Sequence, residues 1–234
     1  MGFAELKKSI KDSSDKKQSE ILQRFFKTGP GEYGEGDVFL GIKVPLLRKI
    51  AKENIDVKLD EIVLLLNSAF HEERLVALFI LVQKYLKAGQ EEKEKIFNTY
   101  IKNIEKINNW DLVDLSAPLI VGAYLFDKDK TILFNYAKSK NLWEKRIAIL
   151  SSFYFIKHGM FDVTLRLSKI LLNDTHDLIH KAAGWMLREI GKRDLRTEED
   201  FLIKYYKNMP RTMLRYAIEK FPERKRQLYL KGKI

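Results

Sequence analysis

The chain is organised around one stretch near its middle, Asn108-Asn109-Trp110-Asp111-Leu112-Val113-Asp114-Leu115-Ser116-Ala117-Pro118. Asn109 is a residue type that caps helix N-termini, and Asp111 in the first turn favours the positive end of the helix dipole. Trp110 and Asp114 are four residues apart, which places them on one helix face. Pro118 removes a backbone donor, so we predict a break or kink just after Asp114. Such a stretch is unusual for a helix that only packs a core.

Outward from this stretch, the sequence predicts further helices. Residues 3–27 form one candidate, with an interruption between Asp12 and Asp15, and Pro45 suits the first turn of another that runs to Glu53. Between them, 29–37 is a glycine-rich, acidic loop that lacks the Gly-Lys-Ser/Thr ending of a phosphate loop, which argues against nucleotide binding there. Period 3.6 also fits eleven later segments, near 59–67, 71–87, 91–106, 110–126, 128–139, 141–157, 160–172, 176–191, 196–207, 210–220 and 222–230.

These helices repeat. A charged residue occupies a similar slot, just before alanine in most cases, in five of them: Arg74, Asp111, Arg146, Lys181 and Arg215. The steps are 37, 35, 35 and 34 residues, which is typical of a solenoid built from helix pairs. The sequence therefore predicts an all-α, HEAT-like helical repeat solenoid, an α-α superhelix, with the basic members in a row near Asp111 and Asp114. A ladder of salt bridges between repeats is an equally good interpretation of the same spacing.

The amino-acid composition excludes several classes of fold and of binding site. The 234 residues have 12 Gly, 5 Pro and no Cys, which argues against sandwiches, barrels, disulfide frameworks and thiolate metal sites. No apolar run reaches the ~18 residues of a membrane span, and the charged N-terminus lacks a signal-peptide core. We expect a single domain over residues 1–234, a cytoplasmic location and no membrane partner. The net charge of +11 suggests a polyanionic partner, although a solvated lysine-rich surface would also explain it.

Candidate chemical groups are few. His176 and His180 are four residues apart but lack the glutamate of a zinc protease and a third ligand, so we expect neither a metal nor a cofactor. Of the three tryptophans, Trp110 and Trp185 lie beside the repeating charged position, whereas Trp143 begins a helix. Core packing is the usual role of tryptophan, but this placement favours a surface for an aromatic or cationic ligand.

Five motifs in this order resemble one known family. They are Phe39–Pro45, Trp110–Asp114, Trp143–Leu150, Lys181–Glu189 and Arg211–Ala217. The chain, from about Phe25 to Phe221, resembles the AlkD-type DNA alkylation repair glycosylases. The resemblance implies HEAT-like repeats with a concave basic face for duplex DNA. It also implies excision of cationic alkylpurines, such as 3-methyladenine and 7-methylguanine, without base flipping.

The resemblance also assigns residues. It implies that Asp114 is catalytic, that Trp110 and Trp185 flank the lesion, and that Arg146 belongs to the catalytic site. It gives Arg188 a phosphate contact, and Lys43 stands where some members carry a polar amide. With the basic row, the expected DNA contacts are Lys43, Arg74, Lys181, Arg188 and Arg215. The partner expected is double-stranded DNA with alkylated bases, bound by a monomer.

One alternative is a non-catalytic helical scaffold that binds nucleic acid or an acidic protein. Asp114 discriminates between the two readings, because a carboxylate in a basic groove repels phosphate and a pure binder has no reason to place one there.

Overall fold

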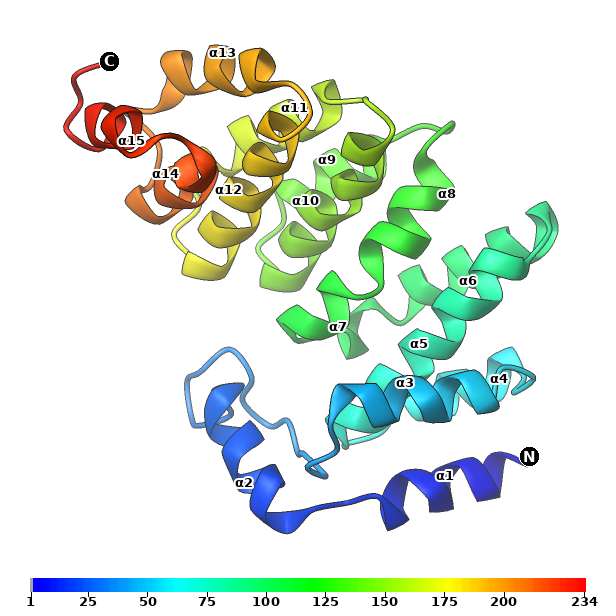
Figure 1. Ribbon diagram of the computed structural model, residues 1–234. Coiled ribbons are helices and arrows are strands. Elements are labelled where there is room, and N and C mark those ends of the chain that lie inside the picture. Colours follow the sequence, from blue (N-terminus) through cyan, green and yellow to red (C-terminus); the bar gives the residue numbers. More distant parts are fainter. Residues whose placement is uncertain (1) are drawn as a thin grey trace. The chain divides into compact units, whose positions relative to one another are not determined.

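The computed structural model describes residues 2–234 and consists of helices joined by short connections, apart from a long loop over 26–43 between the second and third helices (Figure 1). Over these residues the β-type pairing is limited to an isolated bridge between Val38 and Phe70. The predicted all-α helical repeat fold is thus confirmed. The chain divides into two compact units, unit 1 (Met1–Ile120) and unit 2 (Val121–Ile234). A single domain and a concave basic face both stay predictions.

Unit 1 is built around α5 (His71–Lys87), whose residues 71–82 are all buried. A helix buried on every side belongs in the middle of a core, and α1, α3, α4, α6 and α7 all pack on it. The predicted interruption near Asp12–Asp15 is confirmed, because Asp15 caps a second helix by accepting a hydrogen bond from Gln18 N. The other helices of unit 1 are α1 (Phe3–Asp12), α2 (Lys16–Phe25), α3 (Val44–Glu53), α4 (Leu59–Leu66), α6 (Gln90–Lys102), the 3₁₀ turn η1 (Ile104–Lys106) and α7 (Trp110–Asp114).

One carboxylate of α5 fastens three consecutive amides of the loop between α2 and α3. Glu72 accepts hydrogen bonds from the backbone amides of Leu40, Gly41 and Ile42 at 2.8 to 3.1 Å. Gly41 has a φ of +87°, and a side chain there would overlap the backbone oxygen of Asp15. The glycine is therefore required for the loop to lie against the start of α2, and Phe39 and Asp37, just before it in the loop, are buried.

The predicted break after Asp114 is confirmed. α7 ends at Asp114, and Pro118 begins η2 (Pro118–Gly122), a π-helical turn that leads into α8 (Ala123–Leu125). Proline has no amide hydrogen, so the usual ladder fails at this point and the chain rewinds with a wider turn. α7 is consequently one short turn of helix, set apart from the segment that follows.

Unit 2 has two layers. α10 (Leu142–Lys157), α12 (Asp177–Gly191) and α14 (Arg211–Ala217) lie side by side, and α9 (Thr131–Ala137), α11 (Asp162–Ile170) and α13 (Leu195–Tyr205) cover them (Figure 1). The 3₁₀ turns η3 (Leu171–Asn173) and η4 (Ile218–Lys220) and the helix α15 (Glu223–Leu230) complete the unit. Gly184 on α12 permits the close approach of α14, because a Cβ there would overlap the Met213 carbonyl oxygen and lie 2.6 Å from Tyr216 Cβ.

Candidate functional site

α7 carries two of the expected site residues, Trp110 and Asp114, and its start is fixed by side chains. Asn109 Oδ1 accepts a hydrogen bond from Trp110 N at 2.8 Å, which confirms the predicted cap. Asp111 Oδ1 accepts from Leu112 N at 2.9 Å. Trp110 and Asp114 are both half-buried, whereas Asn109 and Asp111 are buried. A single helical turn is marginal by itself, so these caps and the contacts below decide where Trp110 and Asp114 lie.

Trp110 packs on a cluster of rings. Its indole stacks on Phe26 with ring centres 5.2 Å apart and planes 15° apart. Phe26 stacks on Phe39 at 4.8 Å, and Phe39 stacks on the imidazole of His71 at 4.4 Å. Phe25, which is exposed, meets Trp110 edge-on at 6.1 Å. Unit 1 therefore presents Trp110 on a backing of aromatic rings from α2, the following loop and α5.

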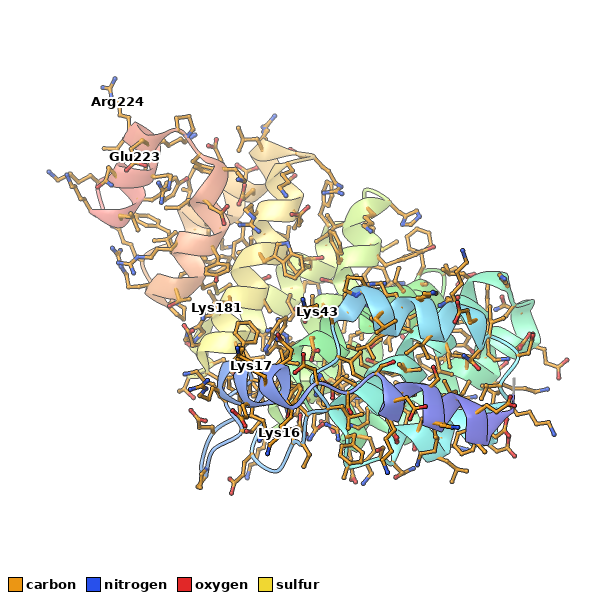
Figure 2. All side chains as sticks on the ribbon, turned by 60° about the horizontal axis from the view of Figure 1, so that its bottom comes forward. Lys16, Lys17, Lys43, Lys181, Glu223 and Arg224 are labelled. Carbon is orange, nitrogen blue, oxygen red and sulfur yellow. The ribbon has the colours of Figure 1, made fainter. Side chains whose placement is uncertain are left out.

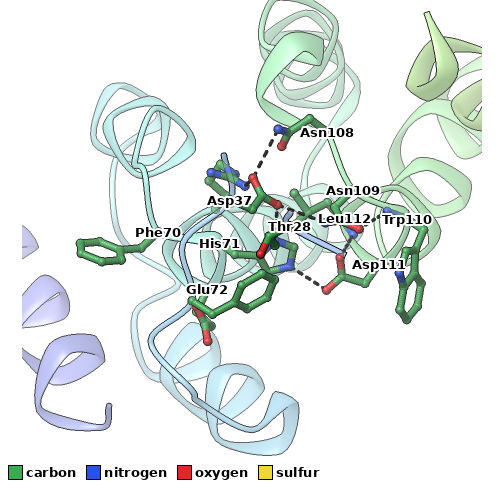
Figure 3. Close-up of polar contacts among 12 residues, drawn as sticks. Thr28, Asp37, Phe70, His71, Glu72, Asn108, Asn109, Trp110, Asp111 and Leu112 are labelled. Carbon is green, nitrogen blue, oxygen red and sulfur yellow. Dashed lines mark hydrogen bonds and ion pairs between the residues drawn. The ribbon is translucent and has the colours of Figure 1, made fainter. Parts of the chain in front are cut away.

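His71 lies between two buried carboxylates (Figure 3). Its Nε2 is 2.8 Å from Asp111 Oδ2, and its Nδ1 is 3.1 Å from Asp37 Oδ2. Asp37 Oδ2 also accepts from Asn109 Nδ2 at 3.1 Å. Burial by itself would lower the pKa of His71, but the two adjacent carboxylates, Asp111 first, raise it to about 9. The group is thus an imidazolium at neutral pH and donates to both acids.

Arg74 differs from the expectation of a surface cation. Its guanidinium is buried, and it donates hydrogen bonds to Asp37 Oδ1 at 2.5 Å and to the Ser68 carbonyl at 3.0 Å. Burial tends to raise the pKa of Asp37, but the bond from His71 and the charge of Arg74 hold that pKa below its usual range. The structure therefore places Arg74 inside the network beside α7, where it balances a carboxylate, and not on the exposed surface where it was expected.

Lys43 is exposed at the start of α3, as are Lys16 and Lys17 at the start of α2 (Figure 2). Lys43 borders a mostly apolar cavity of about 350 Å³ that also reaches His71 and Asp111. The structure thus places one expected DNA contact on the surface of unit 1, close to the buried network.

The remaining expected residues lie on α10, α12 and α14 of unit 2. Arg146 is buried and donates to the Leu178 carbonyl at 2.6 Å. Trp185 is half-buried, and its Nε1 donates to Glu189 Oε1 at 3.3 Å. The other three cations differ in how far they are exposed to solvent. Arg188 is the least exposed and pairs with Glu219, Lys181 is more exposed and pairs with Asp177 at 2.7 Å, and Arg215 is exposed.

The cations of unit 2 therefore fit both interpretations of the repeat spacing, a basic row on the surface and a ladder of salt bridges between repeats. Arg188–Glu219 is a salt bridge between repeats, as the alternative predicts, because Arg188 belongs to α12 and Glu219 follows α14. Lys181 instead pairs within its own helix, and the exposed Arg215 remains on the surface.

Sequence reasoning missed Asp37, His71, Phe26 and Phe39. The signal was present in His71-Glu72-Glu73-Arg74, four charged or polar residues that open a long, mostly apolar helix and must find partners where that helix is buried. His176 caps the start of α12, where its Nδ1 accepts from Leu178 N, and His180 Nε2 donates to the Asp174 carbonyl in the preceding turn. Across residues 2–234 no cluster of acids and histidines could hold a metal ion, and no helix is long and apolar enough to cross a membrane.

The comparisons with known proteins agree on one family. The family model described as DNA alkylation repair enzyme matches residues 6–221. A solved structure described as a predicted DNA alkylation repair enzyme from Enterococcus faecalis is similar, with a TM-score of 0.71 and 16% sequence identity, over 90% of this chain and 98% of that one. No curated protein matches. With the family model covering nearly the whole sequence and a solved structure of the same fold, the chain belongs to the DNA alkylation repair enzyme family.

Proposed function

We propose that this repair enzyme is a monofunctional DNA glycosylase. It hydrolyses the N-glycosidic bond of cationic alkylpurines, 3-methyladenine and 7-methylguanine, in duplex DNA and without base flipping. The observation that carries the proposal is α7, on which one short, capped turn presents a half-buried carboxylate, Asp114, and a ring-backed indole, Trp110, on a single face.

The chemistry requires a carboxylate close to the sugar. Breaking the bond builds oxocarbenium character on the deoxyribose, and a nearby carboxylate in a partly dry site stabilises that charge and orients water. In the proposed mechanism Asp114 is ionised and supplies this stabilisation. Trp110 and Trp185 pack their faces against the sugar and near the positive base, where cation–π attraction favours the lesion over a normal base.

The leaving group decides the substrate. A purine alkylated at N3 or N7 already carries a positive charge and departs as a neutral molecule, so no general acid is needed. A neutral base such as uracil would need protonation and in most enzymes a pocket that accepts the extruded base. One carboxylate is therefore sufficient for cationic lesions and insufficient for neutral ones.

The cations would hold the backbone. Lys43 and Arg215 are exposed and ready to contact phosphates, and Lys181 can exchange its helix partner Asp177 for one. Arg188 would release Glu219 to do the same. Arg146, whose guanidinium holds the Leu178 carbonyl, is proposed to fix the first turn of α12, on which Lys181 stands.

The experiment that tests the proposal measures base release from duplex DNA containing 7-methylguanine or 3-methyladenine, with uracil, hypoxanthine and 1,N6-ethenoadenine as comparison substrates. The expected result is release of the two cationic bases and none of the three neutral ones. Binding of duplex DNA without any release would favour the scaffold function, and efficient uracil or hypoxanthine excision would contradict the mechanism. A monomeric state and a cytoplasmic location stay predictions.

A further inference from the structure

We propose that His71 is a positioning residue: it holds α7, and with it Trp110 and Asp114, in a single place by hydrogen bonds to two carboxylates and by the ring stack. The effect on catalysis depends on the proposed glycosylase function. The effect on the position of Trp110 does not.

His71 is bonded to the start of α7 by two routes. The direct route is Asp111, whose Oδ2 is 2.8 Å from His71 Nε2 and whose Oδ1 accepts from Leu112 N. The second route passes from His71 Nδ1 to Asp37 Oδ2, then to Asn109 Nδ2, and from Asn109 Oδ1 to Trp110 N. Both routes end on residues 109–112, the first turn of the helix that carries Trp110 and Asp114.

The rings supply a third route. The His71 imidazole, Phe39 and Phe26 form a cluster in which every pair of ring centres is 4.4 to 5.1 Å apart, and the Trp110 indole stacks on Phe26 at 5.2 Å. The indole therefore rests on Phe26, and both Phe26 and Phe39 pack against the same imidazole that holds Asp111. A shift of His71 acts on Trp110 through its backbone and its ring together.

The protonated form of His71 is the one that completes these contacts. A neutral imidazole has one N–H, but both ring nitrogens face a carboxylate, so loss of the proton leaves either Asp37 or Asp111 without its donor. Arg74 neutralises Asp37, Glu72 is occupied by the amides of residues 40–42, and Lys43 borders the same cavity. Deprotonation therefore gives the buried group an unbalanced negative charge, and the weakened attachment is the one to α7.

A general role in stability would not have this pattern. Buried ion pairs often contribute little net stability and are replaceable by apolar residues. Here the hydrogen bonds converge on a five-residue helix, which has too few internal hydrogen bonds to fix its own position. The distinguishing property is thus the geometry of Trp110, which can be measured apart from overall stability.

The test uses 5-fluorotryptophan in the full-length protein and ¹⁹F NMR. The Trp110 signal is assigned by its loss in Trp110→Phe, and Trp143 serves as the internal reference. Asp111→Asn removes one carboxylate from His71. Asn54→Ala is the matched control. Asn54 directly follows α3 in unit 1, and its side chain donates a buried hydrogen bond to the Ile50 carbonyl of that helix. This bond does not involve α7.

The expected result is a displaced or broadened Trp110 signal in Asp111→Asn and an unchanged one in Asn54→Ala. The single-turnover rate of 7-methylguanine release falls about tenfold or more in Asp111→Asn, because a small misplacement of reacting groups slows the chemistry, while affinity for undamaged duplex DNA stays within about twofold. An unchanged Trp110 signal, or rates that merely follow the melting temperature in both variants, would overturn the proposal.

A second measurement needs no variant of the network. In the wild type the Trp110 signal should move between about pH 8 and 10 while the Trp143 signal stays fixed, and a Trp110 signal constant over this range would overturn the proposal even if Asp111→Asn failed to fold. Absence of base release by the wild type would remove the proposed function, yet the ¹⁹F result would still decide the positioning role.

Discussion

Raising the pH from 7 to 10 should destabilise unit 1, because it removes the proton that His71 uses to bind two carboxylates. The pKa of His71 is about 9 in the folded protein against an ordinary value of 6.5. A raised pKa in the folded state means that the stabilisation is complete below about pH 6.5 and is lost as the pH rises through about 9.

The magnitude follows from the shift. Each pKa unit corresponds to about 1.4 kcal/mol, so the full stabilisation at low pH is about 3 kcal/mol. Because part of it has gone by pH 7, the loss between pH 7 and 10 is about 2.5 kcal/mol by proton linkage. His71 is buried and is not screened by solvent, so no reduction for exposure applies.

The assay is urea unfolding followed by circular dichroism at unit steps from pH 6 to 10, comparing the wild type with His71→Gln. Subtracting the unfolding free energy of one protein from that of the other removes the contributions of the titrating groups that the two proteins share. Between pH 7 and 10 the wild type should lose about 2.5 kcal/mol more than His71→Gln. Parallel pH profiles for the two proteins would show that His71 does not bind its proton more tightly in the folded state. If His71→Gln does not fold, Asp111→Asn replaces it, and its loss should be smaller and begin at lower pH.

Three further predictions concern other parts of the chain. Burial raises the pKa of Glu198 to about 8, so the carboxyl keeps its proton in the folded protein at pH 7. Glu198→Gln should therefore raise the unfolding free energy at pH 7 by up to about 3 kcal/mol, and this gain should vanish toward pH 4.5. Equal stability of the two proteins in urea at pH 7 would contradict this. Gly184→Ala should separate α12 from α14 and lower stability by about 1 to 3 kcal/mol, whereas Gly89→Ala, which meets no atom within 4 Å, should have little effect on the melting temperature. Affinity for duplex DNA should fall steeply between 50 and 200 mM salt and Arg215→Ala should reduce that slope, as measured by fluorescence anisotropy; an affinity independent of salt would exclude phosphate contacts.

The helices were predictable because their signals are local. Period 3.6, the cap at Asn109, the interruption before Asp15 and the break at Pro118 each depend on residues within a few positions of one another, and each is confirmed. The repeat steps of 34–37 residues also located α10, α12 and α14 as neighbours.

The surroundings of α7 were not predictable in the same way. Asp37, His71 and Asp111 are separated by 34 and 40 residues, and no periodicity links a loop carboxylate to a helix-start histidine. Arg74 illustrates the limit: its register matched that of Arg215, but a buried partner, Asp37, holds it in the interior, whereas Arg215 is exposed. Spacing predicts which helix face a cation occupies and leaves open which acid lies opposite.

In the proposed mechanism the Asp114 carboxylate stabilises the sugar as the base departs, so removing its charge without changing its shape should stop base release. Single-turnover release of 7-methylguanine from duplex DNA is compared among the wild type, Asp114→Asn and Asp56→Asn, which removes the same charge from an exposed position of unit 1. We predict that Asp114→Asn loses most base release, by about a hundredfold or more, while it binds DNA as well as or slightly more tightly than the wild type, and that Asp56→Asn behaves as the wild type. Undiminished release by a folded Asp114→Asn protein would contradict the account.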